Sequence, residues 1–210
     1  MDSFWHFVFG FSVGFIGVIP PGLLNLTAAK ISVNQGRRAA VLFCIGASLV
    51  VVAQVYVGVF FSKLLTDNQQ VLIALERFAI IAFFALSIFF FIKARLDTAT
   101  EVKAVEKSGY KLLGHGIILS TLNVFPIPFY IGFSSFLADR DLFKFESPTA
   151  HFFIFGACLG TFLMLLAYVK YVKKFGFDSV NFARNINYLL SGLTFLIALV
   201  SLIKMRDDIF

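Results

Sequence analysis

Helix breakers interrupt the first long apolar stretch of the sequence. Pro20, Pro21 and Gly22 stand inside an apolar run that extends from about residue 4 to residue 29. If this run crosses a membrane, each proline removes a backbone hydrogen bond, and the carbonyl groups left in lipid cost several kcal/mol unless neighbours bond them. The pattern predicts either a packing kink or a discontinuous helix. In the second case a half-helix starts near Gly22 and directs free N–H groups and a partial positive charge toward the protein centre.

Polar side chains follow this break directly. Asn25 and Thr27 can both donate and accept hydrogen bonds. The start of a half-helix stabilises anionic groups such as a carboxylate. Pro21, Gly22, Asn25 and Thr27 are therefore candidate substrate-binding residues.

A second apolar run repeats this arrangement. Thr121 and Asn123 precede Pro126, and Tyr130 follows it. An asparagine in mid-membrane is expensive unless its amide is paired. These four residues complete the candidate binding set, with the alternative that Asn25 and Asn123 only bond each other or a broken helix end.

Two titratable residues are candidates for proton coupling. Glu76 lies about one turn inside the third apolar stretch, and His115 lies at the start of the fourth. A carboxylate within a membrane span is a functional candidate by default, and histidine titrates near neutral pH. The alternatives are that Glu76 pairs with the adjacent Arg77 and that His115 is an ordinary interfacial histidine.

The remaining reactive residues form no pattern typical of a catalytic site, a metal site or a cofactor site, so none of these is expected. Cys44 and Cys158 are the two cysteines, and neither stands beside a proline break. A membrane thiol electron carrier needs a reactive thiol pair there, and a metal-ion exporter needs Asp, Glu, His or Cys ligands at the centre. Both remain alternatives, and the chain is not expected to be an enzyme.

The composition indicates that lipid contacts much of the surface. Of the 210 residues 59 % are hydrophobic and 14 % are charged, whereas soluble domains are about 25 % charged. The net charge of +6 comes mostly from Lys and Arg in short runs at the ends of apolar stretches. This placement indicates membrane topology, and no nucleic-acid partner is expected.

The sequence predicts an all-α integral membrane protein with six transmembrane helices. A spanning helix needs about 20 mostly apolar residues, and six stretches qualify: residues 4–29, 39–62, 71–92, 112–137, 150–169 and 186–203. The connections after the first, third and fifth spans hold twelve Lys and Arg, against six on the other side. The positive-inside rule then places both termini outside the cytoplasm.

The sequence also indicates an internal duplication of a three-span segment. A charged linker at residues 94–111 separates residues 1–93 from residues 112–210, and Phe43–Leu49 resembles Phe153–Leu159, 110 positions on. Three spans per copy insert the second copy upside down. We therefore expect two inverted three-helix repeats whose first helices, the first and fourth of the chain, are broken at mid-membrane, as in many secondary transporters.

The region after the first break resembles a known family. The chain is similar there to the LysE/RhtB family of amino-acid exporters, and the matching residues are Pro21, Gly22, Asn25, Gly36, Arg37, Arg38 and Ala39. Leu24 replaces the family's aspartate, and Leu122-Asn123 resembles the start of a leucine-asparagine-proline-lysine motif whose lysine is missing. The chain resembles a divergent member.

The resemblance implies export of amino acids or similar small zwitterionic solutes by alternating access, coupled to protons. The expected location is the bacterial inner (plasma) membrane, as a multi-pass protein. A small-molecule solute and the lipid bilayer are the expected partners, and a homodimer is left open. The missing aspartate and lysine leave the solute and the coupling ion unspecified.

Overall fold

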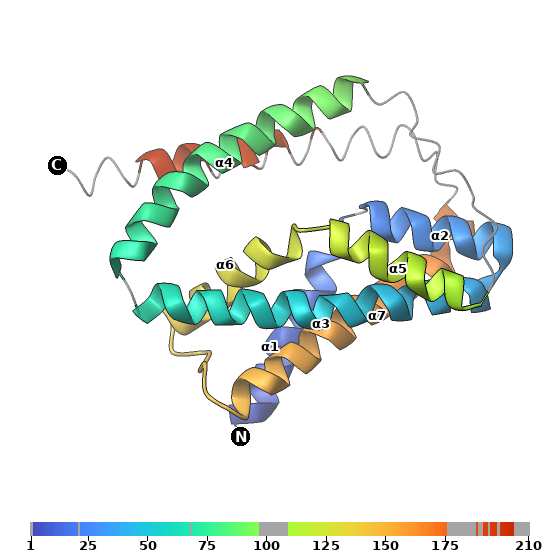
Figure 1. Cartoon of the computed structure of the whole chain (residues 1–210), viewed down its shortest axis with the longest axis horizontal. Coiled ribbons are helices and arrows are strands. Elements are labelled where there is room, and N and C mark those ends of the chain that lie inside the picture. The colour runs from blue at the N-terminus through green and yellow to red at the C-terminus, as the bar shows by residue number, and fades with distance from the viewer. Residues whose placement is uncertain are drawn as a thin grey trace. The chain divides into compact units, whose positions relative to one another are not determined.

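The computed structural model describes residues 2–20, 22–67, 69–96, 109–175, 188, 191–192, 194–196 and 198–203. Within these ranges every regular element is an α-helix (Figure 1). The chain forms two compact units, one of residues 1–66 and 102–176 and the other of residues 67–101 and 177–210.

The first unit contains the helices on both sides of the two predicted breaks. They are α1 (Asp2–Gly17), α2 (Leu23–Gln35), α3 (Arg37–Asp67), α5 (Tyr110–Leu122), α6 (Pro126–Ala138) and α7 (Thr149–Phe175). Among the described residues, Arg37–Leu65 and Thr149–Tyr171 are each long and apolar enough to cross a membrane, and α5 with α6 passes as a third span bent by 63°. The apolar runs at residues 39–62, 112–137 and 150–169 thus form helices, as the sequence predicts.

Both apolar stretches with central prolines are broken. The first stretch ends its first helix at Gly17 and resumes at Leu23, and the fourth ends α5 at Leu122 and resumes at Pro126. Proline disfavours helical backbone at the residue before it. It suits the first turn of a helix, where Pro126 stands. The breaks therefore follow from the prolines.

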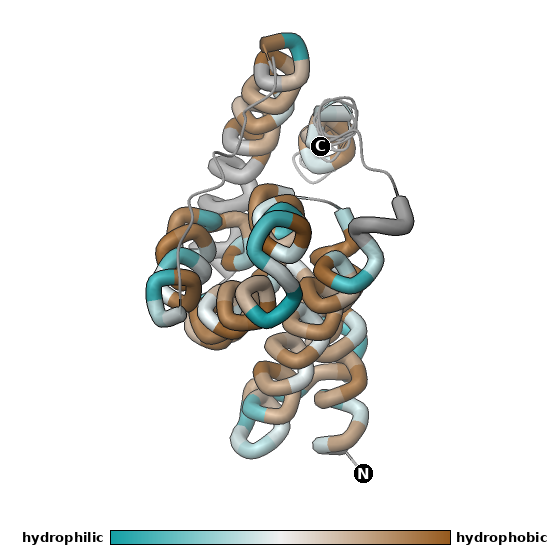
Figure 2. The backbone as a smooth tube through the Cα atoms, turned by 90° about the vertical axis from the view of Figure 1, so that its right-hand side faces the viewer, coloured by the Kyte–Doolittle hydropathy of each residue, from teal (hydrophilic) through white to brown (hydrophobic). Residues whose placement is uncertain are grey.

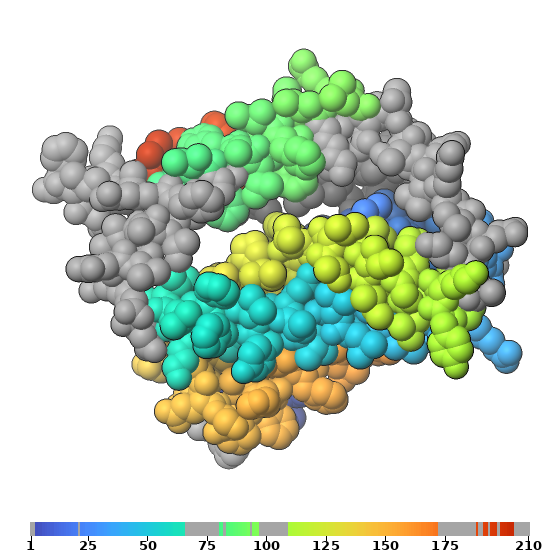
Figure 3. Space-filling model, viewed as in Figure 1, coloured from blue at the N-terminus to red at the C-terminus, as the bar shows by residue number. Residues whose placement is uncertain are grey.

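Glycines let the helices of this unit approach closely. A Cβ atom on Gly10 of α1 would overlap the Phe153 carbonyl of α7, and one on Gly116 of α5 would overlap the Phe43 carbonyl of α3. Small residues at helix contacts are the usual device for close packing in membranes. The space-filling view shows α5 and α6 lying along α3 (Figure 3).

The second unit contains α4 (Gln69–Leu96) and the carboxyl-terminal helical residues. Ser87 Oγ donates a hydrogen bond to the Ser191 carbonyl at 3.0 Å, and Ser191 Oγ donates to the Ser87 carbonyl at 2.9 Å. Reciprocal serine bonds of this kind tie helices together in an apolar environment.

Large apolar side chains lie on the outside. Phe4 is 63 % exposed, Ile81 69 % and Phe155 63 %. Apolar residues also cover most of the helical tube, with hydrophilic ones mainly at turns and ends (Figure 2). Such a surface is unfavourable in water and is expected in lipid.

Candidate functional site

Asn25 stabilises the first break. Its Nδ2 donates to the Val18 carbonyl at 2.7 Å and to the Pro20 carbonyl at 3.2 Å, and the residue is buried. The Tyr168 hydroxyl of α7 donates to the Ile19 carbonyl at 2.5 Å. Side chains thus bond the carbonyl groups of the break itself, which follow the end of α1 at Gly17. Tyr168 gives no signal of this role in the sequence, because a tyrosine near the end of a span usually marks the interface.

The start of α2 keeps free donors. Gly22 is the N-cap and has no side chain, and the first backbone bond of the helix runs from the Leu26 N–H to the Gly22 carbonyl at 3.0 Å. The N–H groups of Leu23, Leu24 and Asn25 therefore lie outside the helix's own hydrogen bonds. Pro21 lies outside the described residues. The arrangement suits an anionic group.

Thr27 lies one turn further along α2. It is 1 % exposed, and its Oγ1 has no hydrogen-bond partner in the part of the chain that the structure describes. Buried hydroxyl groups are usually bonded, so Thr27 Oγ1 is an available polar atom in the interior.

Gln54 stabilises the second break from the neighbouring helix. Its Nε2 donates to the Ser120 carbonyl at 3.0 Å and to the Asn123 carbonyl at 2.7 Å. Its Oε1 is buried and has no partner among the described residues. From the sequence Gln54 reads as a link between helices. The structure adds the free oxygen, which depends on the side-chain orientation and leaves no signal in the sequence.

Asn123 differs from Asn25. It is the C-cap of α5, and its backbone N–H donates to the Ser120 carbonyl at 3.1 Å. Its side chain is half-buried, and no hydrogen bond of its amide is formed within the described ranges. The amide of Asn123 is therefore available to a solute, whereas the Nδ2 of Asn25 bonds the protein itself.

The start of α6 lacks the free donors that α2 has. Pro126 and Pro128 carry no N–H, and the N–H groups of Ile127 and Phe129 donate to the Val124 and Phe125 carbonyls at 3.2 and 3.3 Å. Although the two breaks match in sequence, within the described ranges only the first has N–H groups left outside the helix's own hydrogen bonds.

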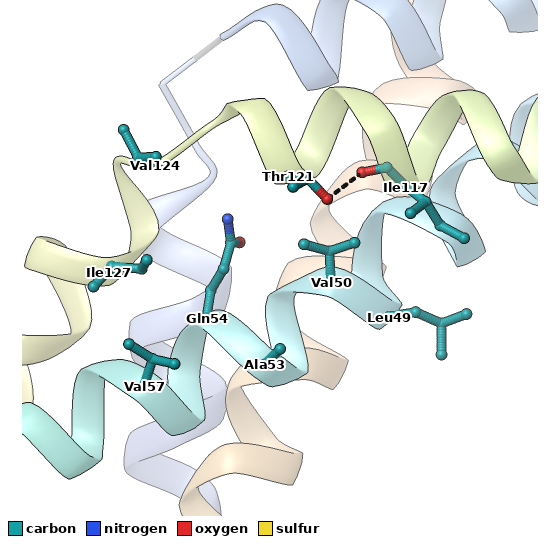
Figure 4. A pocket seen from close by; sticks show the side chains of 9 residues that line it. All are labelled: Leu49, Val50, Ala53, Gln54, Val57, Ile117, Thr121, Val124 and Ile127. Carbon is teal, nitrogen blue, oxygen red and sulfur yellow. Dashed lines mark hydrogen bonds between the residues drawn. The ribbon is translucent and has the colours of Figure 1, made fainter.

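A hollow of about 530 Å³ opens beside the second break (Figure 4). Its lining comes from α3, α5, α6 and the residues between the last two: Leu49, Val50, Ala53, Gln54, Val57, Ile117, Thr121, Val124 and Ile127. The Thr121 hydroxyl donates to the Ile117 carbonyl of its own helix at 2.9 Å. Thr121 and Gln54 are the two polar side chains of a lining that is otherwise apolar.

The other predicted residues lie elsewhere. Tyr130 is buried, and its hydroxyl is 3.4 Å from Thr161 Oγ1, which donates to the Gly14 carbonyl at 3.3 Å. This chain of contacts joins α6, α7 and α1. The His115 ring meets the Phe43 ring edge-on, with 5.5 Å between centroids. Glu76 belongs to α4, and its side chain lies outside the described residues.

The model of the LysE type translocator family matches residues 15–205, which include both breaks. The chain belongs to this family. LysE type translocators are membrane proteins that export amino acids or other small solutes, and they are not enzymes. No curated protein and no solved structure matches the chain.

The cysteines of this LysE type translocator allow a test of the electron-carrier alternative. Cys44 and Cys158 are both free, and Cys158 Sγ donates to the Ser48 carbonyl at 3.5 Å. We expect the double variant Cys44→Ala, Cys158→Ser to retain amino-acid efflux within a few-fold of the parent, because neither cysteine stands beside a proline break in the sequence. Efflux from loaded cells, normalised to protein in the membrane, measures this. Complete loss with normal protein amount would favour the electron carrier.

Proposed function

We propose that this translocator exports an amino acid or a similar zwitterionic solute across the bacterial inner membrane by alternating access, coupled to protons. The observation that carries the proposal is the group of free N–H donors at the start of α2, from Leu23 to Asn25. They suit the carboxylate of the solute. The Asn123 amide, which makes no hydrogen bond to the described residues, is the second candidate contact. His115 and Glu76 remain candidates for proton coupling.

The packing of the first unit supports two inverted repeats. Gly10 of α1 meets the Phe153 carbonyl of α7, and Gly116 of α5 meets the Phe43 carbonyl of α3. The first helix of each half therefore packs on the long helix of the other half: α1 on α7, and α5 on α3. A two-fold exchange of the halves produces this pattern.

The numbering of these contacts is consistent. The reverse contacts run from Gly156 to the Phe7 carbonyl and from Gly46 to the Leu113 carbonyl. Phe7 and Gly10 of α1 correspond to Leu113 and Gly116 of α5, 106 positions on. Phe43 and Gly46 of α3 correspond to Phe153 and Gly156 of α7, 110 positions on. Furthermore, α3 runs in the direction opposite to α7, its counterpart in the other half (Figure 1). Inverted repeats require this opposite sense.

Six spans with both termini outside the cytoplasm complete the proposal. A reporter that is active only in the cytoplasm should give signal when fused after Lys103 and none when fused after Phe210. The basis is the twelve-to-six count of basic residues between the two sides. Signal from both fusions would mean that the number of spans is wrong.

A panel of radiolabelled amino acids tests the function. Cells loaded with each compound, with and without this chain, should differ in efflux for at least one amino acid, and dissipating the proton gradient should reduce that difference. If no amino acid leaves faster and a divalent metal ion does, the metal-exporter alternative replaces this proposal.

A further inference from the structure

The hollow beside the second break lies where the two halves of the chain differ in side-chain size. Where α1 and α7 touch, Gly160 lies against the Phe11 carbonyl. At the corresponding positions of α3 and α5 stand Val50 and Ile117, which line the hollow. The hollow therefore lies at a position where one half has a glycine in contact with backbone and the other half has a valine.

One residue of the lining carries a buried acceptor that has no partner among the described residues. Gln54 is 6 % exposed and its Oε1 has no hydrogen-bond partner among the described residues. Figure 4 shows the Gln54 side chain rising from α3 between Thr121 and Val124. An unpaired buried acceptor costs free energy of about 1–3 kcal/mol, and a donor from a ligand removes that cost.

The end of α5 favours a cation at the same place. Helix carboxyl ends carry a partial negative charge, and Gln54 Nε2 binds the Ser120 and Asn123 carbonyls there. An ammonium group supplies both the positive charge and the N–H donors that Gln54 Oε1 accepts. The start of α2 has the opposite polarity and suits a carboxylate.

The remainder of the lining excludes charge. Apart from Gln54 and Thr121 it consists of Leu, Val, Ala and Ile side chains. An unpaired charge among such residues would be strongly unfavourable. The volume of about 530 Å³ lies within the range of small-molecule sites, about 300–1,000 Å³, so a large side chain fits.

On the basis of the proposed function, amino-acid export, we propose that the solute is an amino acid with a large apolar side chain. Its ammonium group donates to Gln54 Oε1 at the end of α5, and its side chain occupies the hollow between α3, α5 and α6. Leucine and phenylalanine are the model solutes. Lysine and glutamate are excluded, because their side-chain charges would be unpaired there.

The size of the hollow can be tested on purified full-length protein in liposomes loaded with labelled leucine or alanine. Val57 lines the hollow, and Val52 of the same helix is exposed and does not line it. Val57→Phe should lower leucine efflux relative to alanine efflux by about 10-fold, since a misfit of one or two methylene groups costs that much. Val52→Phe makes the same side-chain change outside the hollow and should leave the ratio unchanged.

The acceptor is tested by competition. In wild-type protein, leucine should inhibit labelled leucine efflux at about 10-fold lower concentration than 4-methylpentanoate, which lacks the ammonium group. Gln54→Met removes the acceptor and should abolish this difference. If Gln54→Met does not fold, the Val57 and Val52 pair still decides whether the side chain occupies the hollow.

The outcomes separate the two proposals. Preference for lysine or glutamate over leucine, or equal ratios in Val57→Phe and Val52→Phe, would overturn this inference and leave amino-acid export standing. An unchanged leucine preference in folded Gln54→Met would overturn the ammonium contact. Efflux of no amino acid at all would overturn the proposed function and this inference with it.

Discussion

Replacing Asn25 with leucine should remove most of the folded protein from the membrane. The Asn25 amide donates to the Val18 and Pro20 carbonyls at the end of α1, and leucine cannot donate. Each carbonyl left unpaired away from water costs up to about 1–3 kcal/mol. Because the stability of a protein is only about 5–15 kcal/mol, the loss of two bonds is a large fraction of it.

Asn123→Leu is the matched variant, because the Asn123 amide makes no hydrogen bond to the described residues. We expect normal amounts of folded protein and a half-saturation concentration for efflux raised roughly 5- to 150-fold, from the loss of one hydrogen bond to the solute. Quantitative blotting of membranes gives the first quantity, and efflux against internal concentration gives the second. An equal loss of protein in both variants, or an unchanged half-saturation in Asn123→Leu, would contradict the different roles assigned to the two asparagines.

Gly116→Ala should destabilise the protein, whereas Gly114→Ala should not. A Cβ atom on Gly116 would overlap the Phe43 carbonyl of α3, which is backbone and cannot rotate away. Forcing atoms into a packed contact costs about 1–3 kcal/mol. A Cβ atom on Gly114 has no neighbour within 4 Å. There alanine adds helix propensity, worth up to about 1 kcal/mol.

The thermal stability of the two variants in detergent measures this difference, since both carry the same substitution on α5. Gly116→Ala should melt several degrees below the parent, and Gly114→Ala at or above it. If both melt together, α3 and α5 are not in the close contact that the two-fold exchange of repeats needs.

The prolines predict the most distinctive feature of the fold, which is the break in each of two helices. Pro20 and Pro126 mark both breaks, because proline restricts the backbone wherever it stands. The apolar runs predict the helices for a similar reason. Such features act through the local chain, so a single sequence suffices to find them.

The polarity of the breaks could not be predicted in the same way. Pro126 and Pro128 remove the free donors of α6, while Gly22 leaves those of α2 open. This difference depends on which residue begins each helix, and the structure is needed to identify that residue. Likewise the free oxygen of Gln54 depends on contacts between α3 and α5, which lie far apart in the sequence.

A cysteine at position 22 tests most directly whether the solute binds at the start of α2. Gly22 is exposed, its φ of −112° suits any residue, and a Cβ atom there meets nothing within 4 Å. In protein lacking Cys44 and Cys158, Gly22→Cys should react with a small charged thiol reagent. The exported amino acid should slow the reaction several-fold, with a half-effect near the half-saturation of efflux. Ser147→Cys, exposed between α6 and α7, should react at the same rate with and without it. An unchanged rate at position 22, with the same amino acid still exported, would contradict the assignment of the site.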